Sequence, residues 1–220
     1  MLSRINTSIS FKSSDLFKNI PSLNPEYTQE ENKAKTVTIL GSSKATDAIL
    51  DSMDLCSKVT KDLINNGYNI LTGCGAYGIM GAAYNAASEN SVKDIETGKP
   101  KQNLAIVMEP AWGDEDIEHC IPIGKSTSES DRIDKFSKTS NTILVFPGSA
   151  TTIQEATSLI QKNEYTKNEP LKKIILVGQK FFEGLKLQYD QLAEAKLLKH
   201  KPEELFTVVN SEEEILEQIK

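Results

Sequence analysis

The chain has 220 residues, of which 38% are hydrophobic and 25% are charged. This composition is typical of a globular protein and excludes disordered and collagen-like classes, and the length fits one domain. Acidic residues outnumber basic ones by 31 to 25, which gives a net charge of −6. No basic cluster is present, so we expect no nucleic-acid partner.

The cysteines at positions 56, 74 and 120 are widely spaced and form no CxxC pair. This pattern excludes a disulfide framework and a zinc ribbon, and two histidines are too few to suggest a metal site. No apolar run reaches the ~18–20 residues that span a bilayer, so we expect no membrane partner. Residues 1–14 carry only two cations, which favours an ordinary cytoplasmic start over a transit peptide.

Residues 1–35 lack clear periodicity, and we predict an N-terminal extension with a short helix at 14–19, followed by a single domain at 36–220. In chain order we then expect a strand at 36–40, a helix at 46–66, a strand at 68–71, a helix at 78–88, a strand at 104–108, an irregular stretch at 109–128, a helix at 129–138, a strand at 142–146, a helix ending near 165, a strand at 173–177, a helix at 181–198, a strand at 206–209 and a helix at 211–219. Apolar strands that alternate with helices predict a doubly wound α/β fold, with a mainly parallel sheet covered by helices on both faces.

Ligands of such sheets bind outside the carboxyl ends of the strands. The segments expected to carry function are therefore 41–44, 72–81, 109–112 and 147–152. The third of these segments ends at Trp112, which either packs on the core or stacks on a base.

Residues 73–78 read Gly-Cys-Gly-Ala-Tyr-Gly and match GxGxxG. Glycines at a helix start let the backbone approach a phosphate. The alternative is a tight turn that permits close packing of helix on strand. The position after the second strand, without an acid at the next strand's end, is atypical of a dinucleotide site.

Residues 147–152 read Pro-Gly-Ser-Ala-Thr-Thr and lie between a strand and a helix. Hydroxyl side chains and free amides there suit an anion. The alternative is a capping box at 152–155, in which Glu155 only bonds the backbone. Arg132 has a similar alternative, as part of a solvated charged helix start.

In combination, these elements resemble the LONELY GUY phosphoribohydrolase family, which is often labelled "lysine decarboxylase". Residues 72–81 resemble its GGGxxGLMG element, and 147–155 resemble its PGGxGTxxE element. The strand end at 41–43 matches its GSS, and Arg132 stands where the family places its catalytic arginine.

The resemblance implies a Rossmann-like homodimer that hydrolyses the N-glycosidic bond of nucleoside 5′-monophosphates to free base and ribose 5-phosphate, with no cofactor. It makes Arg132 and Glu155 the catalytic pair. The substrate-binding residues that it implies are Ser42, Gly73, Gly75, Gly148, Ser149, Thr151 and Thr152.

This chain departs from the family pattern in five places. Cys74 replaces one glycine, Ser149 and Thr151 replace two more, Ile133 replaces a lysine and Glu129 replaces a methionine. The loss of a lysine and the gain of an acid make the local field less positive, which predicts weaker binding of a dianionic phosphate or a different substrate.

We expect an ionised Glu155 to stabilise the positive charge that develops on the ribose, and Arg132 to act through its fixed charge and its hydrogen bonds. The alternative function is a non-catalytic module that binds a nucleotide or a nucleotide-like cofactor such as the molybdenum cofactor. A dinucleotide-dependent oxidoreductase is a third possibility. Neither motif contains the lysine that a pyridoxal-phosphate decarboxylase needs for its Schiff base, so we discount the lysine decarboxylase label.

Overall fold

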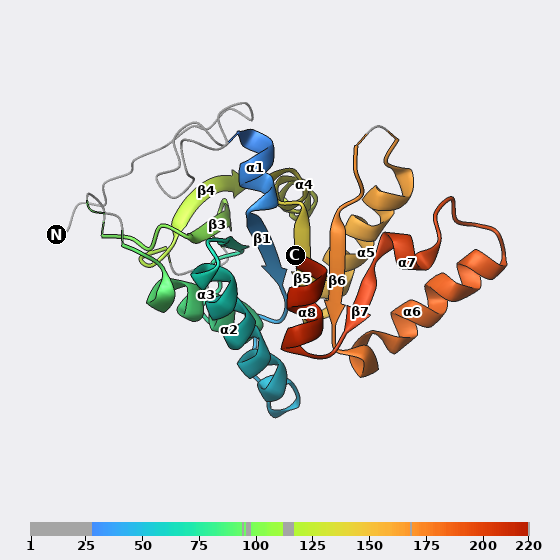
Figure 1. The fold of residues 1–220 in the computed structure, drawn as a ribbon, viewed down its shortest axis with the longest axis horizontal. Helices are drawn as coiled ribbons and strands as arrows, with labels where there is room; N and C mark the ends of the chain where they lie inside the picture. Colours follow the sequence, from blue (N-terminus) through green and yellow to red (C-terminus); the bar gives the residue numbers. More distant parts are fainter. Residues whose placement is uncertain (1–27, 94, 96–97, 112–116, 168, 220) are drawn as a thin grey trace.

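The computed structural model describes residues 28–93, 95, 98–111, 117–167 and 169–219 (Figure 1). Within them, one parallel sheet has the strand order β4-β3-β2-β1-β5-β6-β7. The strands are β1 (Thr36–Leu40), β2 (Asn69–Thr72), β3 (Asn103–Met108), β4 (Ile121–Ser126), β5 (Thr142–Val145), β6 (Lys173–Val177) and β7 (Thr207–Val209). The helices are α1 (Gln29–Ala34), α2 (Leu50–Asn65), α3 (Gly78–Asn90), α4 (Glu129–Thr139), α5 (Ala150–Tyr165), α6 (Gln179–Glu194), α7 (Pro202–Leu205) and α8 (Glu212–Ile219). The predicted doubly wound fold is confirmed.

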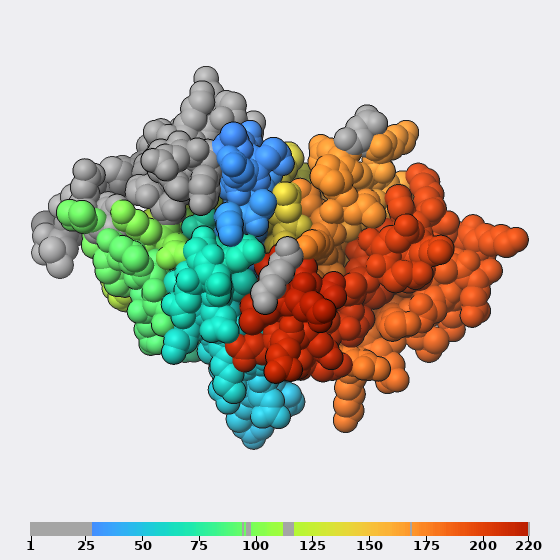
Figure 2. All heavy atoms as spheres, in the orientation of Figure 1, coloured from blue at the N-terminus to red at the C-terminus, as the bar shows by residue number. Residues whose placement is uncertain are grey.

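The central strands are buried on both faces because helices cover both sides of the sheet. Every residue of β1, β2, β3 and β5 is buried. One core contains Phe136 of α4 and Phe182 of α6, and the other contains Val59 of α2 and Ile215 of α8. Figures 1 and 2 show α2, α3 and α8 together on the face of the sheet that carries the core of Val59 and Ile215. Such strands read as continuous apolar runs, which is the pattern that the sequence shows.

The strand order reverses between β1 and β5, the two neighbours at the centre of the sheet. The loops that follow these strands are tied together, since the amide of Ser42 donates to the carbonyl of Pro147 at 3.1 Å. A reversal of this kind opens a crevice at the carboxyl ends of the strands. The fold therefore places the segments 41–44 and 147–152 at one ligand-binding position.

The structure differs from the sequence-based prediction at its edges. The stretch 109–128, expected to be irregular, contains β4, an edge strand interrupted by Pro122 and Gly124 and exposed at Lys125. Such a strand carries no continuous apolar run, so its pattern is weak. Helix α1 lies within the predicted N-terminal extension, and α7 was not predicted. The helix at 14–19 and Trp112 fall outside the described residues.

Cys74 and Cys120 form a disulfide, which the sequence did not suggest. The two cysteines are 46 residues apart, and only the fold brings them together. The exclusion of a multi-disulfide framework concerns dense cysteine patterns and gives no information on one isolated bond. Cys56 is the free cysteine of the described residues, and burial raises the pKa of its thiol to about 12.

Gly78 is required at the start of α3 for two separate reasons. Its φ is +61°, and a Cβ there would meet the backbone of Lys44 at 2.8 and 2.9 Å. We expect Gly78→Ala to lower the free energy of unfolding by roughly 3–5 kcal/mol, from backbone strain plus overpacking. Urea denaturation measures the change.

Gly67 provides the matched control for this substitution. Its φ is +79°, but nothing lies within 4 Å of a Cβ placed there. Gly67→Ala should therefore cost only the strain, about 1–2 kcal/mol. Equal losses for the two variants would contradict the close approach of the backbone at Gly78.

None of the helices in the described part of the chain is long and apolar enough to cross a bilayer.

Candidate functional site

A cavity of about 90 Å³ lies at the carboxyl ends of β1, β2 and β5. It is lined by Gly41, Ser43, Gly73, Gly75, Met80, Arg132, Ser149, Thr151, Thr152 and Glu155. Pockets that enclose a drug-sized ligand measure roughly 300–1,000 Å³. This cavity is therefore too small to enclose a whole nucleotide, and part of such a ligand would lie outside it.

Arg132 enters the cavity from the first turns of α4. The helix is capped by Ser128, whose hydroxyl accepts from the amide of Asp131 at 3.2 Å. The next residue, Ile133, packs in the core, and Arg132 itself is only 6% exposed. The interpretation of Arg132 as a solvated surface charge is therefore wrong.

Two backbone carbonyls fix the guanidinium of Arg132. Its Nε donates to the carbonyl of Ile106 at 3.1 Å, and its Nη2 donates to the carbonyl of Gly73 at 2.7 Å. The group also lies over the ring of Phe136, 5.7 Å from the centroid. Because arginine stays protonated in proteins, this arrangement places a permanent, oriented positive charge on the cavity wall.

The N-terminus of α5 forms the opposite wall. The helix begins at Ala150, its N-cap is Ser149, and the Ser149 side chain makes no capping hydrogen bond. Thr152 is thus the third helical residue, so the capping box proposed for 152–155 is wrong. The amides of the first turn have no partner within the helix and suit an anion, and Thr151 lines the same cavity.

Glu155 lies one turn further along α5 and lines the same cavity. Burial raises the pKa of its carboxyl group to about 7, the charge of Arg132 opposes the rise, and the charge of Glu129 adds to it. The expectation was an ionised Glu155, and the raised pKa means that this carboxyl group holds its proton to a higher pH than an ordinary glutamate does.

The glycine loop at 73–78 contributes differently from α5. Gly73 and Gly75 line the cavity. The start of α3, however, is closed by the protein itself, since the amides of Ile79 and Met80 donate to the carbonyl of Ser42 at 2.8 and 3.4 Å. The loop is thus a floor of the cavity, and its helix start serves packing.

Of the expected binding residues, Ser42 and Gly148 support the cavity from behind its lining. The Ser42 hydroxyl donates to the carbonyl of Lys44 at 2.9 Å. A Cβ on Gly148 would meet the side chain of Thr152 and, at 2.9 Å, the amide of Ser42. The motif had suggested that Ser42 lines the cavity, but its two neighbours, Gly41 and Ser43, do so instead.

Sequence reasoning also missed Met80, which lines the cavity from the first turn of α3. It belongs to the motif at 72–81, but only helical geometry shows which of its residues face the ligand. Among the residues that the structure describes, no three His, Cys, Asp or Glu side chains gather in a way that could hold a metal ion.

Comparison with known proteins gives a family and a set of similar folds. The model of the family described as "Possible lysine decarboxylase" matches residues 80–219. The Moco carrier protein from Chlamydomonas reinhardtii is 19% identical with a TM-score of 0.55, over 84% of this chain and 96% of that chain. The molybdenum cofactor binding protein from the phototrophic bacterium Rippkaea orientalis is 15% identical with a TM-score of 0.56, over 84% and 93%. The search of curated proteins found no match. At these identities the structural likeness shows a shared fold.

Proposed function

The chain belongs to the family described as possible lysine decarboxylase, and from that premise we propose that it hydrolyses the N-glycosidic bond of a nucleoside 5′-monophosphate to free base and ribose 5-phosphate. One observation carries the proposal: Arg132, Glu155 and the N-terminus of α5 line the same cavity. The lining contains no lysine among the described residues. The family's label therefore gains no support from the site, since Schiff-base chemistry needs a lysine amine.

The cavity suggests how such a substrate binds. The phosphate lies at the start of α5, where the amides of the first turn and the hydroxyls of Ser149, Thr151 and Thr152 can donate to it. The ribose occupies the remaining volume between Arg132 and Glu155. The base extends beyond the lining, because about 90 Å³ does not enclose a whole nucleotide.

The proposed step is a displacement at C1′ of the ribose. The bond from C1′ to the base nitrogen breaks and the base keeps the electron pair, which leaves positive charge on the sugar. The carboxylate of Glu155 takes a proton from water as the water oxygen bonds to C1′, and the proton then passes to the departing base. A pKa of about 7 suits a group that accepts and returns a proton near neutral pH.

A second candidate is a non-catalytic module that carries a nucleotide-like cofactor. It is favoured by the fold shared with proteins titled as carrying or binding the molybdenum cofactor. The hydroxyls of Ser149 and Thr151, where the resemblance expects glycines, also change the anion-binding wall.

We further propose a homodimer in the cytoplasm. Analytical ultracentrifugation tests the first point, and fractionation of cells tests the second.

Incubation of the purified protein with AMP, GMP, CMP and UMP tests hydrolysis directly. We expect ribose 5-phosphate from at least one nucleotide and no ribose from the matching nucleoside, because the nucleoside lacks the group that the start of α5 binds. Calorimetry with the same panel separates the two candidates. Tight binding without product would contradict the hydrolase and support the carrier.

A further inference from the structure

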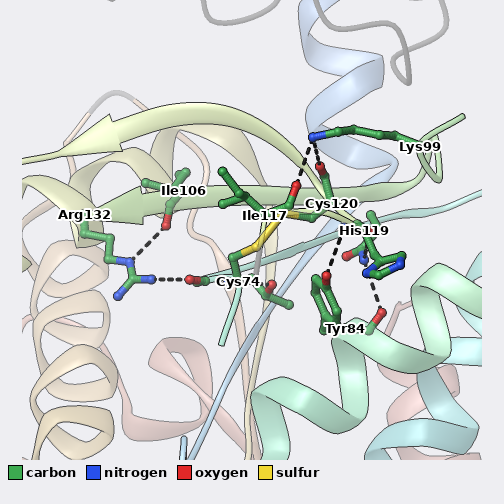
Figure 3. Close-up of a disulfide and its surroundings, with 11 residues drawn as sticks. Cys74, Tyr84, Lys99, Ile106, Ile117, His119, Cys120 and Arg132 are labelled. Atoms are coloured by element: carbon green, nitrogen blue, oxygen red, sulfur yellow. Dashed lines mark hydrogen bonds between the residues drawn. A yellow bond between two sulfur atoms is a disulfide. The ribbon is translucent and has the colours of Figure 1, made fainter. Parts of the chain in front are cut away.

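The disulfide between Cys74 and Cys120 joins the floor of the cavity to the beginning of the edge strand β4 (Figure 3). Cys74 lies between Gly73 and Gly75, which both line the cavity. Cys120 directly precedes β4, and both cysteines are fully buried. The bond therefore links a loop of the candidate site to a distant part of the sheet.

The Cys120 end of this link is firmly anchored. Lys99 Nζ donates to the carbonyls of Ile117 and Cys120 at 2.9 and 3.2 Å. Asn103, at the start of β3, donates through Nδ2 to the carbonyl of His119 at 2.8 Å. Figure 3 shows the two bonds from Lys99 on the segment that leads into Cys120. This end can therefore act as a fixed point for Cys74.

The Cys74 end controls the peptide that holds Arg132. Cys74 has a φ of +63°, a conformation that residues with a Cβ rarely adopt. Its amide donates to Thr72 Oγ1 at 3.0 Å. That amide and the carbonyl of Gly73 belong to one planar peptide group, and the carbonyl accepts from Arg132 Nη2 at 2.7 Å. A rotation at Cys74 therefore turns the acceptor of Arg132.

We propose that the disulfide is a redox-controlled latch, which in the oxidised protein holds the peptide between Gly73 and Cys74 against Arg132 and keeps the cavity competent for a phosphate ligand. A dithiol opens the latch. It transfers two electrons and two protons to the disulfide, which breaks into two thiols while the dithiol closes to its own disulfide. The identity of the ligand rests on the proposed function.

The third cysteine takes no part in this exchange. Cys56 lies in α2, is fully buried, and its Sγ donates to the carbonyl of Ile79 at 3.7 Å. Its thiol stays protonated at neutral pH, so it does not attack the disulfide. Cys56→Ala is therefore a matched control that removes a cysteine and leaves the latch in place.

The test compares ribose 5-phosphate binding by calorimetry in the air-oxidised protein and after dithiothreitol. We expect at least fivefold weaker binding on reduction in the wild type and in Cys56→Ala. Cys120→Ser should bind like the reduced protein and should not respond to dithiothreitol. Thiol titration of the denatured protein should give one thiol before reduction and three after it. Three thiols in the oxidised sample, or equal affinity in both states, would overturn the latch.

Hydrogen exchange gives a readout that needs no ligand. Reduction should speed exchange of the amides at 73–81 and leave those of β1 and β5 unchanged. Faster exchange throughout the sheet would show that the disulfide stabilises the whole fold, and this result would overturn the latch. Unchanged exchange at 73–81 would overturn it as well. If ribose 5-phosphate binds neither state, the phosphate site of the proposed function fails, while hydrogen exchange still decides the latch. Should Cys120→Ser not fold, Cys74→Gly opens the latch with a residue that accepts the same φ, and it should show the same fast exchange at 73–81.

Discussion

Arg132→Lys is expected to lower kcat/KM for the preferred nucleotide by about 100-fold or more. Lysine keeps the positive charge, but a single ammonium group cannot reproduce the planar fork that donates from Nε to Ile106 and from Nη2 to Gly73. The charge would then be free to move away from the position where the phosphate and the ribose bind. Steady-state kinetics with the nucleotide identified by the panel measures the loss.

The control for this substitution lies on the same side of the molecule, outside the cavity. Lys162 of α5 pairs with Asp134 of α4, and both side chains are partly exposed. Lys162→Met should change activity less than twofold and stability by no more than about 0.5 kcal/mol. If Arg132→Lys retained full turnover while remaining folded, the orientation of the guanidinium would have no catalytic role, and the proposed hydrolase would lose one of its two central residues.

The parts of the fold that the sequence predicts well are those whose pattern comes from burial. The strands β1, β5 and β6 appear as apolar runs because helices cover both of their faces, and each was placed within one residue. The edge strand β4 has one partner and alternating exposure, so its residues are not uniformly apolar. Sequence patterns therefore locate the centre of such a sheet better than its rim.

The candidate site was predictable as a set of segments, but its side-chain geometry was not. The topology brings the loops after β1, β2 and β5 to one edge of the sheet, whereas Arg132 and Glu155 were expected there only from the resemblance to a known family. Which of Gly41, Ser42 and Ser43 faces the cavity depends on local backbone direction. The raised pKa of Glu155 depends on burial, and the pairing of Cys74 with Cys120 depends on packing across 46 residues. A single sequence contains none of these distances.

Glu155→Gln gives the second large effect, and it separates a functional carboxyl group from a structural one. We expect kcat/KM to fall by about 100-fold or more, because an amide cannot accept the proton of water. In the wild type, kcat/KM should rise about tenfold per pH unit below the pKa of about 7 and level off above it. The glutamine variant should lack this dependence, which a pH series of initial rates would show.

The same substitution should stabilise the protein at high pH. The carboxyl group has a pKa of about 7 in the folded protein against 4.5 as its ordinary value, so the folded state holds the proton more tightly. Stability is therefore lost as the pH rises from about 4.5 to 7, and above 7 the charged, partly buried carboxylate costs roughly 1–3 kcal/mol. Glutamine avoids that cost, so Glu155→Gln should be more stable than the wild type by this amount at pH 8 and about equal to it at pH 4.

Urea denaturation at the two pH values measures this difference, with Glu183→Gln on the exposed side of α6 as a control that should show none. A residue whose removal stabilises the fold and abolishes turnover is retained for chemistry, since sites that function often do so at a cost in stability. If Glu155→Gln were equally destabilised at both pH values, Glu155 would be part of the packing of α5. The carrier would then become the better explanation of the cavity.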